Sequence, residues 1–319
     1  MKIVVLDGYT LNPGDLSWDG FRNLGDVTIY DRTDSTETYE RSKDAEIVIT
    51  NKTIIDKKLI DKLTKLKYIG VLATGYNVVD VSAAKKKNVI VTNIPAYGTD
   101  SVAQMIFALI LDITNHVSSH NAAVRQGAWS KSKDFCFWNK PIIELSGKTI
   151  GIIGFGAIGR KVADIAQVFD MNVIAYSRTI TDESKRKNFK WVSLNSIFEE
   201  SDFLSLNCPL NNATKGIINR DTLNKMKKNA ILINASRGPL IVEEHLAEAL
   251  NKGTISAAGL DVLSEEPPSK DNPLIKAKNC VLTPHIAWAA KEARMRLMNI
   301  AVSNLKAFLN GNPENIIES

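Results

Sequence analysis

The 319-residue sequence predicts an α/β protein of two domains, each built on a doubly wound parallel sheet, with a cleft between them and the second domain inserted into the first. Short apolar strands alternate with helical patterns in two separate blocks, and a glycine-rich turn joins strand to helix early in the second block. After Pro284 the chain makes no further strand, so its last helix is free to return to the first block. We expect the first domain at residues 1–98 and 287–319, and the second at residues 99–286.

The first block alternates apolar strands with amphipathic helical patterns at residues 56–66 and 80–87. This alternation is typical of a parallel sheet with helices on both faces. We expect its strands at residues 2–7, 27–30, 47–50, 68–73 and 89–92.

A prolyl linker at residues 94–98 ends the first block, and a long helix is expected from Asp100 to Val117 because apolar residues recur there at helical spacing. The loop from Gly127 to Pro141 then carries four aromatic side chains. Such density predicts packing against a lid or a partner subunit, or a small hydrophobic cluster of its own, and the sequence leaves both interpretations open. The four are Trp129, Phe135, Phe137 and Trp138.

The second block has strand Thr149–Ile153 followed by glycines at 154, 156 and 159. In this GxGxxG pattern Gly154 permits a tight turn, Gly156 admits a pyrophosphate, and Gly159 lets the helix pack closely on the strand. The helix N-terminus presents free N–H groups to the phosphates. A second strand, Asn172–Tyr176, closes a Rossmann-like unit, so we expect dinucleotide binding rather than an ordinary glycine turn. Further strands are expected at residues 202–207, 230–234, 255–260 and 280–283, and a helix stripe from Met298 to Leu309.

The charge distribution, the cysteine spacing and the lack of long apolar runs indicate which partners and sites to expect. The net charge of +5 is spread along the chain, with its densest spots at residues 85–87 and 227–228, so we expect no nucleic-acid partner. The three cysteines show neither metal nor redox spacing, and we expect no metal site. We see no signal peptide and no transmembrane segment, which predicts a cytoplasmic protein without a membrane partner.

Three groups that can carry chemistry follow strand ends in the second block: Arg237, the Glu265-Glu266 pair and His285. Ligands of open parallel sheets bind beyond these ends. An arginine fork holds a carboxylate through two hydrogen bonds, and a histidine oriented by a carboxylate donates a proton. Beside a nicotinamide, the three suit hydride transfer to a small 2-oxo acid with His285 as general acid. The alternative is that they are surface groups and a turn histidine.

Along its whole length the chain resembles the D-isomer-specific 2-hydroxyacid dehydrogenase family. The matching motifs are the turn at 154–159, Asn234-Ala-Ser-Arg-Gly238, Gly259-Leu-Asp-Val262 with Glu266-Pro267, and Pro284-His285. The resemblance implies that Arg237, Glu266 and His285 are catalytic. Glu266 is chosen over Glu265 because the acid precedes the proline, and a formate-oxidising branch carries Gln there.

The glycerate dehydrogenase (hydroxypyruvate reductase) branch is more similar still, in the aromatic loop Asp134-Phe-Cys-Phe-Trp138 and in Pro284-His-Ile-Ala-Trp288. The resemblance implies reduction of hydroxypyruvate or glyoxylate to D-glycerate or glycolate. It also implies a homodimer in which Trp138 approaches the partner's active site. The first domain, flavodoxin-like, would bind the substrate carboxylate, together with Arg237 and His285, through the backbone of Ala73, Thr74 and Gly75.

The resemblance further implies cofactor contacts throughout the second domain. They are Gly154, Gly156, Ala157, Ile158 and Gly159 in the turn, Cys208, Pro209 and Thr214 near the adenine, and Ala235, Ser236, Arg237, Asp261 and His285 near the nicotinamide. One position departs from the usual NAD pattern, because Ser177-Arg178-Thr179 follows the second strand where a ribose-binding carboxylate is expected. Arg178 could pair with a 2′-phosphate, with Ser177 or Thr179 donating to it. We therefore favour NADPH over NADH, or use of both; alternatively Arg178 stacks on the adenine of NADH.

The sequence is also compatible with two other functions. Within the family, the enzyme could reduce another 2-oxo acid, such as pyruvate in D-lactate dehydrogenase. Outside enzymes, a dinucleotide-sensing interaction protein is an alternative because the family includes corepressors. The intact set of Arg237, Glu266 and His285 weighs against that second alternative.

Overall fold

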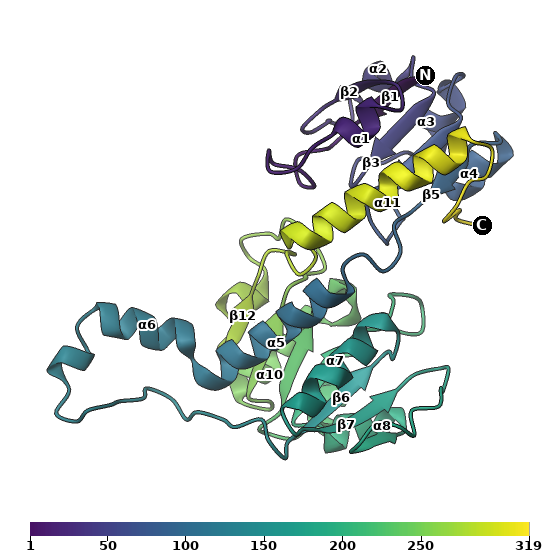
Figure 1. The fold of residues 1–319 in the computed structure, drawn as a ribbon. Coiled ribbons are helices and arrows are strands. Elements are labelled where there is room, and N and C mark those ends of the chain that lie inside the picture. Colours follow the sequence, from purple (N-terminus) through teal and green to yellow (C-terminus); the bar gives the residue numbers. More distant parts are fainter. Residues whose placement is uncertain (319) are drawn as a thin grey trace. The chain divides into compact units, whose positions relative to one another are not determined.

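The structure, a computed structural model, describes residues 1–318, so Ser319 of the expected first domain lies outside the described residues. The chain divides into two compact units. The first comprises Met1–Gly98 and the chain from Ala289 onward, and the second comprises Thr99–Trp288 (Figure 1). Each unit contains one sheet of parallel strands with helices around it, which confirms the expected α/β class.

In the first unit the five strands are ordered β2-β1-β3-β4-β5. Helices α3 and α4 pack on one face, where Ile60 and Ala84 are buried with Val48 and Ile69. Helix α11 contacts β4, and the ring of Phe308 lies 4.8 Å from that of Tyr68. The elements are β1 (Lys2–Val5), α1 (Asp19–Arg22), β2 (Asp26–Ile29), α2 (Thr38–Ser42), β3 (Ile47–Thr50), α3 (Lys57–Lys62), β4 (Tyr68–Val71), α4 (Val81–Lys86), β5 (Ile90–Thr92) and α11 (Lys291–Leu309).

The second unit holds a seven-stranded sheet in the order β12-β11-β10-β9-β6-β7-β8. One edge strand, β8, was not expected from the sequence; its three residues are too few to show a period, and pairing with β7 makes it a strand. The strands are β6 (Thr149–Ile153), β7 (Asn172–Tyr176), β8 (Phe189–Trp191), β9 (Phe203–Leu206), β10 (Ile231–Asn234), β11 (Ala257–Leu260) and β12 (Cys280–Leu282). The α-helices are α5 (Thr99–Asn115), α6 (Val117–Arg125), α7 (Ala157–Val168), α8 (Leu194–Glu200), α9 (Arg220–Lys225) and α10 (Glu243–Lys252), with short 3₁₀ turns at Trp129–Lys131, Gly238–Leu240 and Pro273–Lys276.

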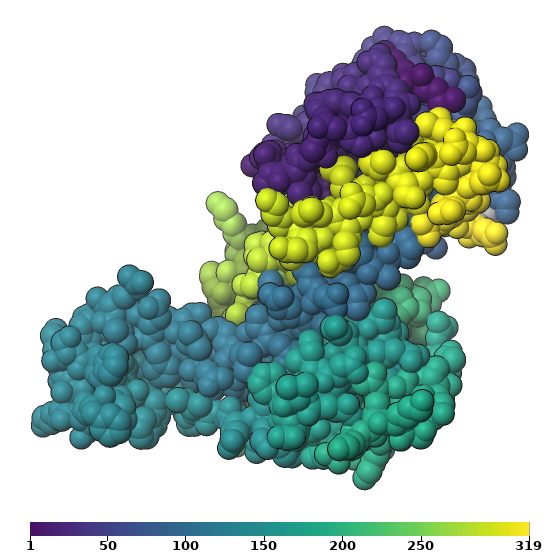
Figure 2. All heavy atoms as spheres, viewed as in Figure 1, coloured from purple at the N-terminus to yellow at the C-terminus, as the bar shows by residue number. Residues whose placement is uncertain are grey.

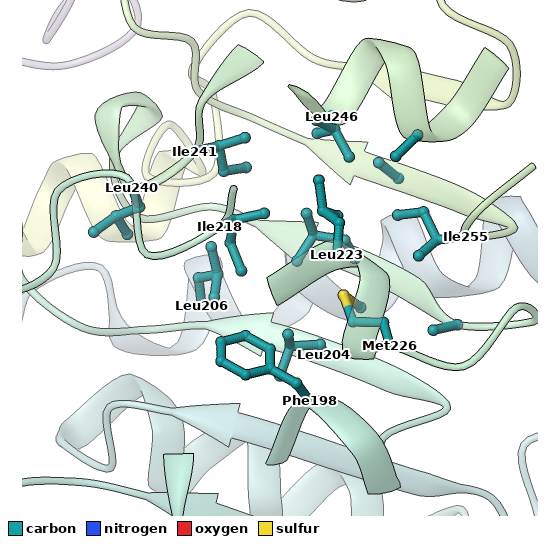
Figure 3. Close-up of a cluster of buried hydrophobic side chains, with 14 of the residues drawn as sticks. Phe198, Leu204, Leu206, Ile218, Leu223, Met226, Leu240, Ile241, Leu246 and Ile255 are labelled. Atoms are coloured by element: carbon teal, nitrogen blue, oxygen red, sulfur yellow. The ribbon is translucent and has the colours of Figure 1, made fainter. Parts of the chain in front are cut away.

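Two hydrophobic clusters lie on the two faces of this sheet. One buries Ile106 and Ile110 of α5 and Val162 of α7 against the strands. The other buries Phe198 of α8, Leu223 of α9 and further side chains of α10 (Figure 3). Both faces are therefore covered, which leaves the ends of the strands as the accessible part of the sheet.

The expected helix from Asp100 to Val117 is wrong in its last turn. Helix α5 ends at Asn115, and α6 begins at Val117 after His116, whose φ of 52° lies in the left-handed region. No residue of α6 is buried, and the segment stands out from the rest of the second unit (Figure 2). Among residues 1–318 no single helix has the length and apolar character to cross a bilayer; α5 and α6 meet that test only as a pair bent by 54°.

Candidate active site

Because every strand of the second unit runs parallel, the residues after the strands gather at one edge of the sheet. Gly154 follows β6, Ser177 follows β7, and Cys208 follows β9. Ala235–Arg237 follow β10, Asp261 follows β11 and His285 follows β12. The fold thus places these expected cofactor and catalytic residues at the same edge of the sheet, the one formed by the carboxyl ends of its strands.

The glycine-rich turn has the geometry of a phosphate cradle. Gly154 has a φ of +93°, and a Cβ there would lie 2.5 Å from the Cys208 nitrogen. A Cβ on Gly156 would meet nothing within 4 Å, so there is open space in front of this backbone. Helix α7 begins here, and its first intrahelical bond is from Arg160 N–H to the Gly156 carbonyl at 3.0 Å. The N–H groups of Ala157, Ile158 and Gly159 precede that bond, so they are free to bind an anion.

The five residues that follow β7, 177–181, include no acidic residue. Arg178 is exposed and its guanidinium has no ion-pair partner among residues 1–318. Glu183, five residues further on, is enclosed by two arginines: Arg160 Nη1 lies 2.8 Å from it and Arg186 Nε 2.6 Å. Its negative charge is therefore compensated within the loop. Ser177 is half-buried and Thr179 exposed, both next to Arg178.

The loop that carries Arg237 is held by the side chains of Asn234, which is buried, and Ser236, which is half-buried. The Asn234 side chain accepts from Ser236 N–H at 3.0 Å and donates to the Arg237 carbonyl at 2.9 Å, while Ser236 Oγ donates to the Cys208 carbonyl at 2.8 Å. The exposed Arg237 guanidinium donates only to the Ser236 carbonyl, at 2.6 Å, and forms no ion pair within residues 1–318. It is therefore free to bind an external carboxylate. Asn234 belonged to the motif, but its role in the loop was not anticipated.

Gly238 brings this loop against the next one. A Cβ on Gly238 would lie 2.0 Å from the carbonyl carbon and oxygen of Leu263 and 2.4 Å from the Ser264 nitrogen. Only glycine allows this approach between the Arg237 loop and the loop that carries Glu266. In the sequence, the only sign of this close approach is the glycine that follows Arg237.

His285 and Glu266 are in direct contact. The imidazole Nδ1 lies 2.6 Å from Glu266 Oε2, and both side chains are about one-third exposed. Of the two adjacent glutamates, Glu266 is the one that contacts the ring, and its Oε1 accepts from Leu263 N–H at 3.1 Å. With Nδ1 facing a carboxylate, Nε2 is the ring nitrogen that remains for a substrate.

Asp261 holds the turn that carries His285. Its carboxylate is buried and accepts from Thr283 Oγ1 at 2.6 Å, Ile286 N–H at 2.9 Å and Ala287 N–H at 2.8 Å. The histidine itself has a φ of 54°, and its N–H donates to the Asp261 carbonyl at 2.8 Å. Sequence reasoning missed this support, because the partners lie more than twenty residues apart. The nicotinamide contact implied for Asp261 stays a prediction.

Cys208 and Thr214 line the same edge without being reactive groups. Burial raises the pKa of the Cys208 thiol, which keeps it neutral and suits a wall rather than a nucleophile. The Thr214 hydroxyl donates to the Pro209 carbonyl at 2.7 Å and accepts from Asn211 N–H at 2.9 Å. It therefore shapes the turn at residues 209–214.

In the first unit, the loop after β4 presents backbone N–H groups. The carbonyls of Leu72, Ala73 and Thr74 are all engaged, by Asn51 Nδ2 at 2.6 Å, Ile94 N–H at 3.0 Å and Asn93 Nδ2 at 2.7 Å. In a trans peptide the N–H points opposite to the carbonyl. The N–H groups of Ala73, Thr74 and Gly75 therefore point away from these partners, and none has an acceptor within residues 1–318. We expected strand 68–73; β4 ends at Val71 because the next carbonyls bond side chains and residue 94 instead of a ladder.

A parallel α/β unit with a glycine-rich turn, and with arginine and a carboxylate–histidine pair at the same sheet edge, defines a class of dinucleotide-dependent oxidoreductase. A sequence model of the D-isomer specific 2-hydroxyacid dehydrogenase NAD binding domain matches residues 107–287. The chain belongs to this family.

Individual relatives and solved structures are similar to the chain over most of their length. The chain is 52% identical to a hydroxypyruvate reductase of Blautia hydrogenotrophica over 99% of both chains. It is 40% identical to a glycerate dehydrogenase of Methylorubrum extorquens, over 89% of this chain and 88% of the relative. Among solved structures, an acyclic imino acid reductase in complex with NADPH and D-Arg superposes with a TM-score of 0.87 at 33% identity, covering both chains completely.

Proposed function

We propose that the protein is an NAD(P)-dependent D-2-hydroxyacid dehydrogenase that reduces hydroxypyruvate or glyoxylate. The observation that carries the proposal is the 2.6 Å contact between His285 Nδ1 and Glu266 Oε2 at the sheet edge where Arg237 also lies. Similarity to the hydroxypyruvate reductase over the whole chain supports this substrate class. Pyruvate, the substrate of a D-lactate dehydrogenase, is the alternative that the assay must include.

The residues of the glycine-rich turn fit a dinucleotide. Open space in front of Gly156 and the free N–H groups at the start of α7 suit its pyrophosphate. When bound, the nicotinamide supplies a hydride to the 2-oxo carbon. Further proposed cofactor residues along this edge are Cys208, Pro209, Thr214, Ala235, Ser236, Arg237, Asp261 and His285.

His285 acts as the general acid. Glu266 keeps the proton on Nδ1 and stabilises the imidazolium, so Nε2–H donates to the substrate carbonyl oxygen as it becomes a hydroxyl. The guanidinium of Arg237 binds the substrate carboxylate and stabilises the negative charge that develops on the same oxygen. The three free N–H groups of Ala73, Thr74 and Gly75 bind the carboxylate from the first unit, as a backbone anion site.

We propose NADPH as the preferred cofactor. Arg178 has no ion-pair partner among residues 1–318, and Glu183 of the same loop pairs with Arg160 and Arg186. A 2′-phosphate next to Arg178 would gain charge-assisted hydrogen bonds, and residues 177–181 carry no carboxylate that would repel it.

We also propose a homodimer formed through α6 and the aromatic loop. The apolar surface there is large: Phe135 is 89% exposed, Trp138 64% and Trp129 54%. Phe135→Ser, which removes the most exposed ring, should lower the mass measured by light scattering from dimer to monomer. A wild-type protein that is monomeric at micromolar concentration would contradict the proposal.

The test of the activity is NADPH and NADH oxidation with hydroxypyruvate, glyoxylate and pyruvate. We expect turnover of hydroxypyruvate that falls by about 10²–10⁴-fold in kcat in His285→Ala, with cofactor binding retained. Turnover of none of the three acids, or full activity of His285→Ala, would refute the assignment.

A further inference from the structure

The peptide that carries the Gly75 N–H is held at its carbonyl by the Asn93 side chain. Asn93 Nδ2 donates to the Thr74 carbonyl at 2.7 Å, and the same planar peptide unit carries the Gly75 N–H. Thr74 Oγ1 adds a bond back to the Ile94 carbonyl at 2.8 Å. Rotation of the 74–75 peptide would break the bond from Asn93, so this bond favours the present orientation of the Gly75 N–H.

Asn93 is in turn held by two residues from the other end of the chain. Its N–H donates to the Asn315 carbonyl at 3.3 Å, and its carbonyl accepts from Asn304 Nδ2 at 3.0 Å. Asn315 Nδ2 closes the triangle by donating to Asn304 Oδ1 at 2.7 Å. Asn304 is 1% exposed on α11, and both its donor and its acceptor are satisfied within the triangle.

The C-terminal tail is attached beside this triangle. Ile316 forms an antiparallel bridge with Thr92, and Ile317 N–H donates to the Val91 carbonyl at 2.9 Å. Tyr76, Asn77 and Ile317 are among the residues that line an open cavity of about 430 Å³. The tail thus reaches both the strand before Asn93 and the residues just after Gly75.

We infer that Asn93, Asn304 and Asn315 are positioning residues that aim the Gly75 N–H at the substrate carboxylate, so that the C-terminal tail sets the affinity for 2-oxo acids. The inference rests on the proposed function, because it assumes that the loop at residues 73–75 binds that carboxylate. It assigns to the end of the chain a part in substrate binding that its distance in sequence does not suggest. An amide that must rotate into place on binding costs affinity, whereas one that is already oriented does not.

The contrasting interpretation is that the triangle only stabilises the first unit. The two interpretations differ in kinetics. Loss of stability lowers the fraction of active enzyme and therefore the apparent kcat, with KM unchanged. Loss of positioning raises KM for the 2-oxo acid and leaves KM for NADPH unchanged, since the cofactor residues lie in the second unit.

The experiment uses two near-isosteric variants. Asn93→Asp replaces the donor that holds Thr74 with an acceptor, and Asn315→Asp removes the donor to Asn304. We expect KM for hydroxypyruvate to rise about tenfold in Asn93→Asp and about threefold in Asn315→Asp. Asn312→Asp is the matched control: it adds the same charge to the tail, but its exposed side chain has no partner among residues 1–318. Its KM should equal that of the wild type.

Calorimetric titration of each protein with oxamate in the presence of NADPH measures carboxylate affinity without turnover. If the wild type reduces no 2-oxo acid, the proposed function fails, and a weaker oxamate affinity in the two variants would still support the positioning role. Unchanged KM and unchanged oxamate affinity in both variants, with or without a lower Tm, would overturn the inference.

Discussion

Substitution of Gly238 tests whether contact between two loops fixes the position of Arg237 relative to Glu266. In Gly238→Ala the new Cβ would lie 2.0 Å from the Leu263 carbonyl group, where ordinary contact begins near 3.4 Å. The atoms that it meets are backbone, so the loops must separate by about 1.4 Å. The φ of Gly238 is not in the left-handed region, so the effect is steric alone.

A displacement of about 1 Å at a catalytic group costs on the order of 10²-fold. We therefore expect kcat/KM for hydroxypyruvate to fall about 100-fold, or about 2.7 kcal/mol in transition-state stabilisation. The assay is steady-state NADPH oxidation, with NADPH binding measured separately. Binding should weaken far less than kcat/KM, because the glycine-rich turn that holds the pyrophosphate is not touched and only the implied contacts of residues 235–237 with the nicotinamide are displaced.

Gly253→Ala is the control for stability. Gly253 ends α10 with a φ of +69° and has open space around its Cβ position, so alanine should destabilise the second unit by about 1 kcal/mol without moving the Arg237 loop. Its kcat/KM should match the wild type. A kcat/KM of Gly238→Ala within about threefold of the wild type would refute the reasoning. The contact between the two loops would then not determine the relative position of Arg237 and Glu266.

Three further predictions concern separate features. Glu266→Gln keeps the size of the side chain but removes the charge that stabilises the imidazolium, so kcat should fall about 10–100-fold with NADPH affinity unchanged; equal rates would exclude the carboxylate from proton transfer. Arg178→Asp should shift the ratio of kcat/KM for NADPH over NADH strongly towards NADH, and an unchanged ratio would remove Arg178 from the 2′-phosphate site. Although burial opposes it, Thr149 N–H and the Lys227 ammonium hold the pKa of Asp202 below its ordinary value of 3.8. Its stabilising contribution is present above that value and is lost as pH falls through the lower native pKa. Asp202→Asn should therefore unfold about 1 kcal/mol more easily at pH 7 in urea, a difference that shrinks in acid; a difference independent of pH would contradict this account.

The sequence alone determined the features that depend on neighbouring residues. Alternating apolar strands and amphipathic helices indicated the α/β class, because burial of both faces of a parallel sheet imposes that pattern. The glycines at 154, 156 and 159 predicted the turn, since their spacing reflects local backbone geometry. The position of His285 directly after a strand indicated the sheet edge.

Tertiary structure alone decided the contacts that link distant residues. Residues 189–191 form strand β8 because they pair with β7. Helix α5 ends before His116, whose φ lies in the left-handed region, although the apolar periodicity continues to Val117. The hydrogen bonds from Ile286 N–H and Ala287 N–H to the Asp261 carboxylate, which hold the turn of His285, produce no periodic pattern in the sequence. Asn93 and Asn304 lie 211 positions apart, and each alone resembles any polar residue of a loop or helix. Hydrogen bonds between such residues depend on where the folded backbone brings them, and local propensity carries no information about that.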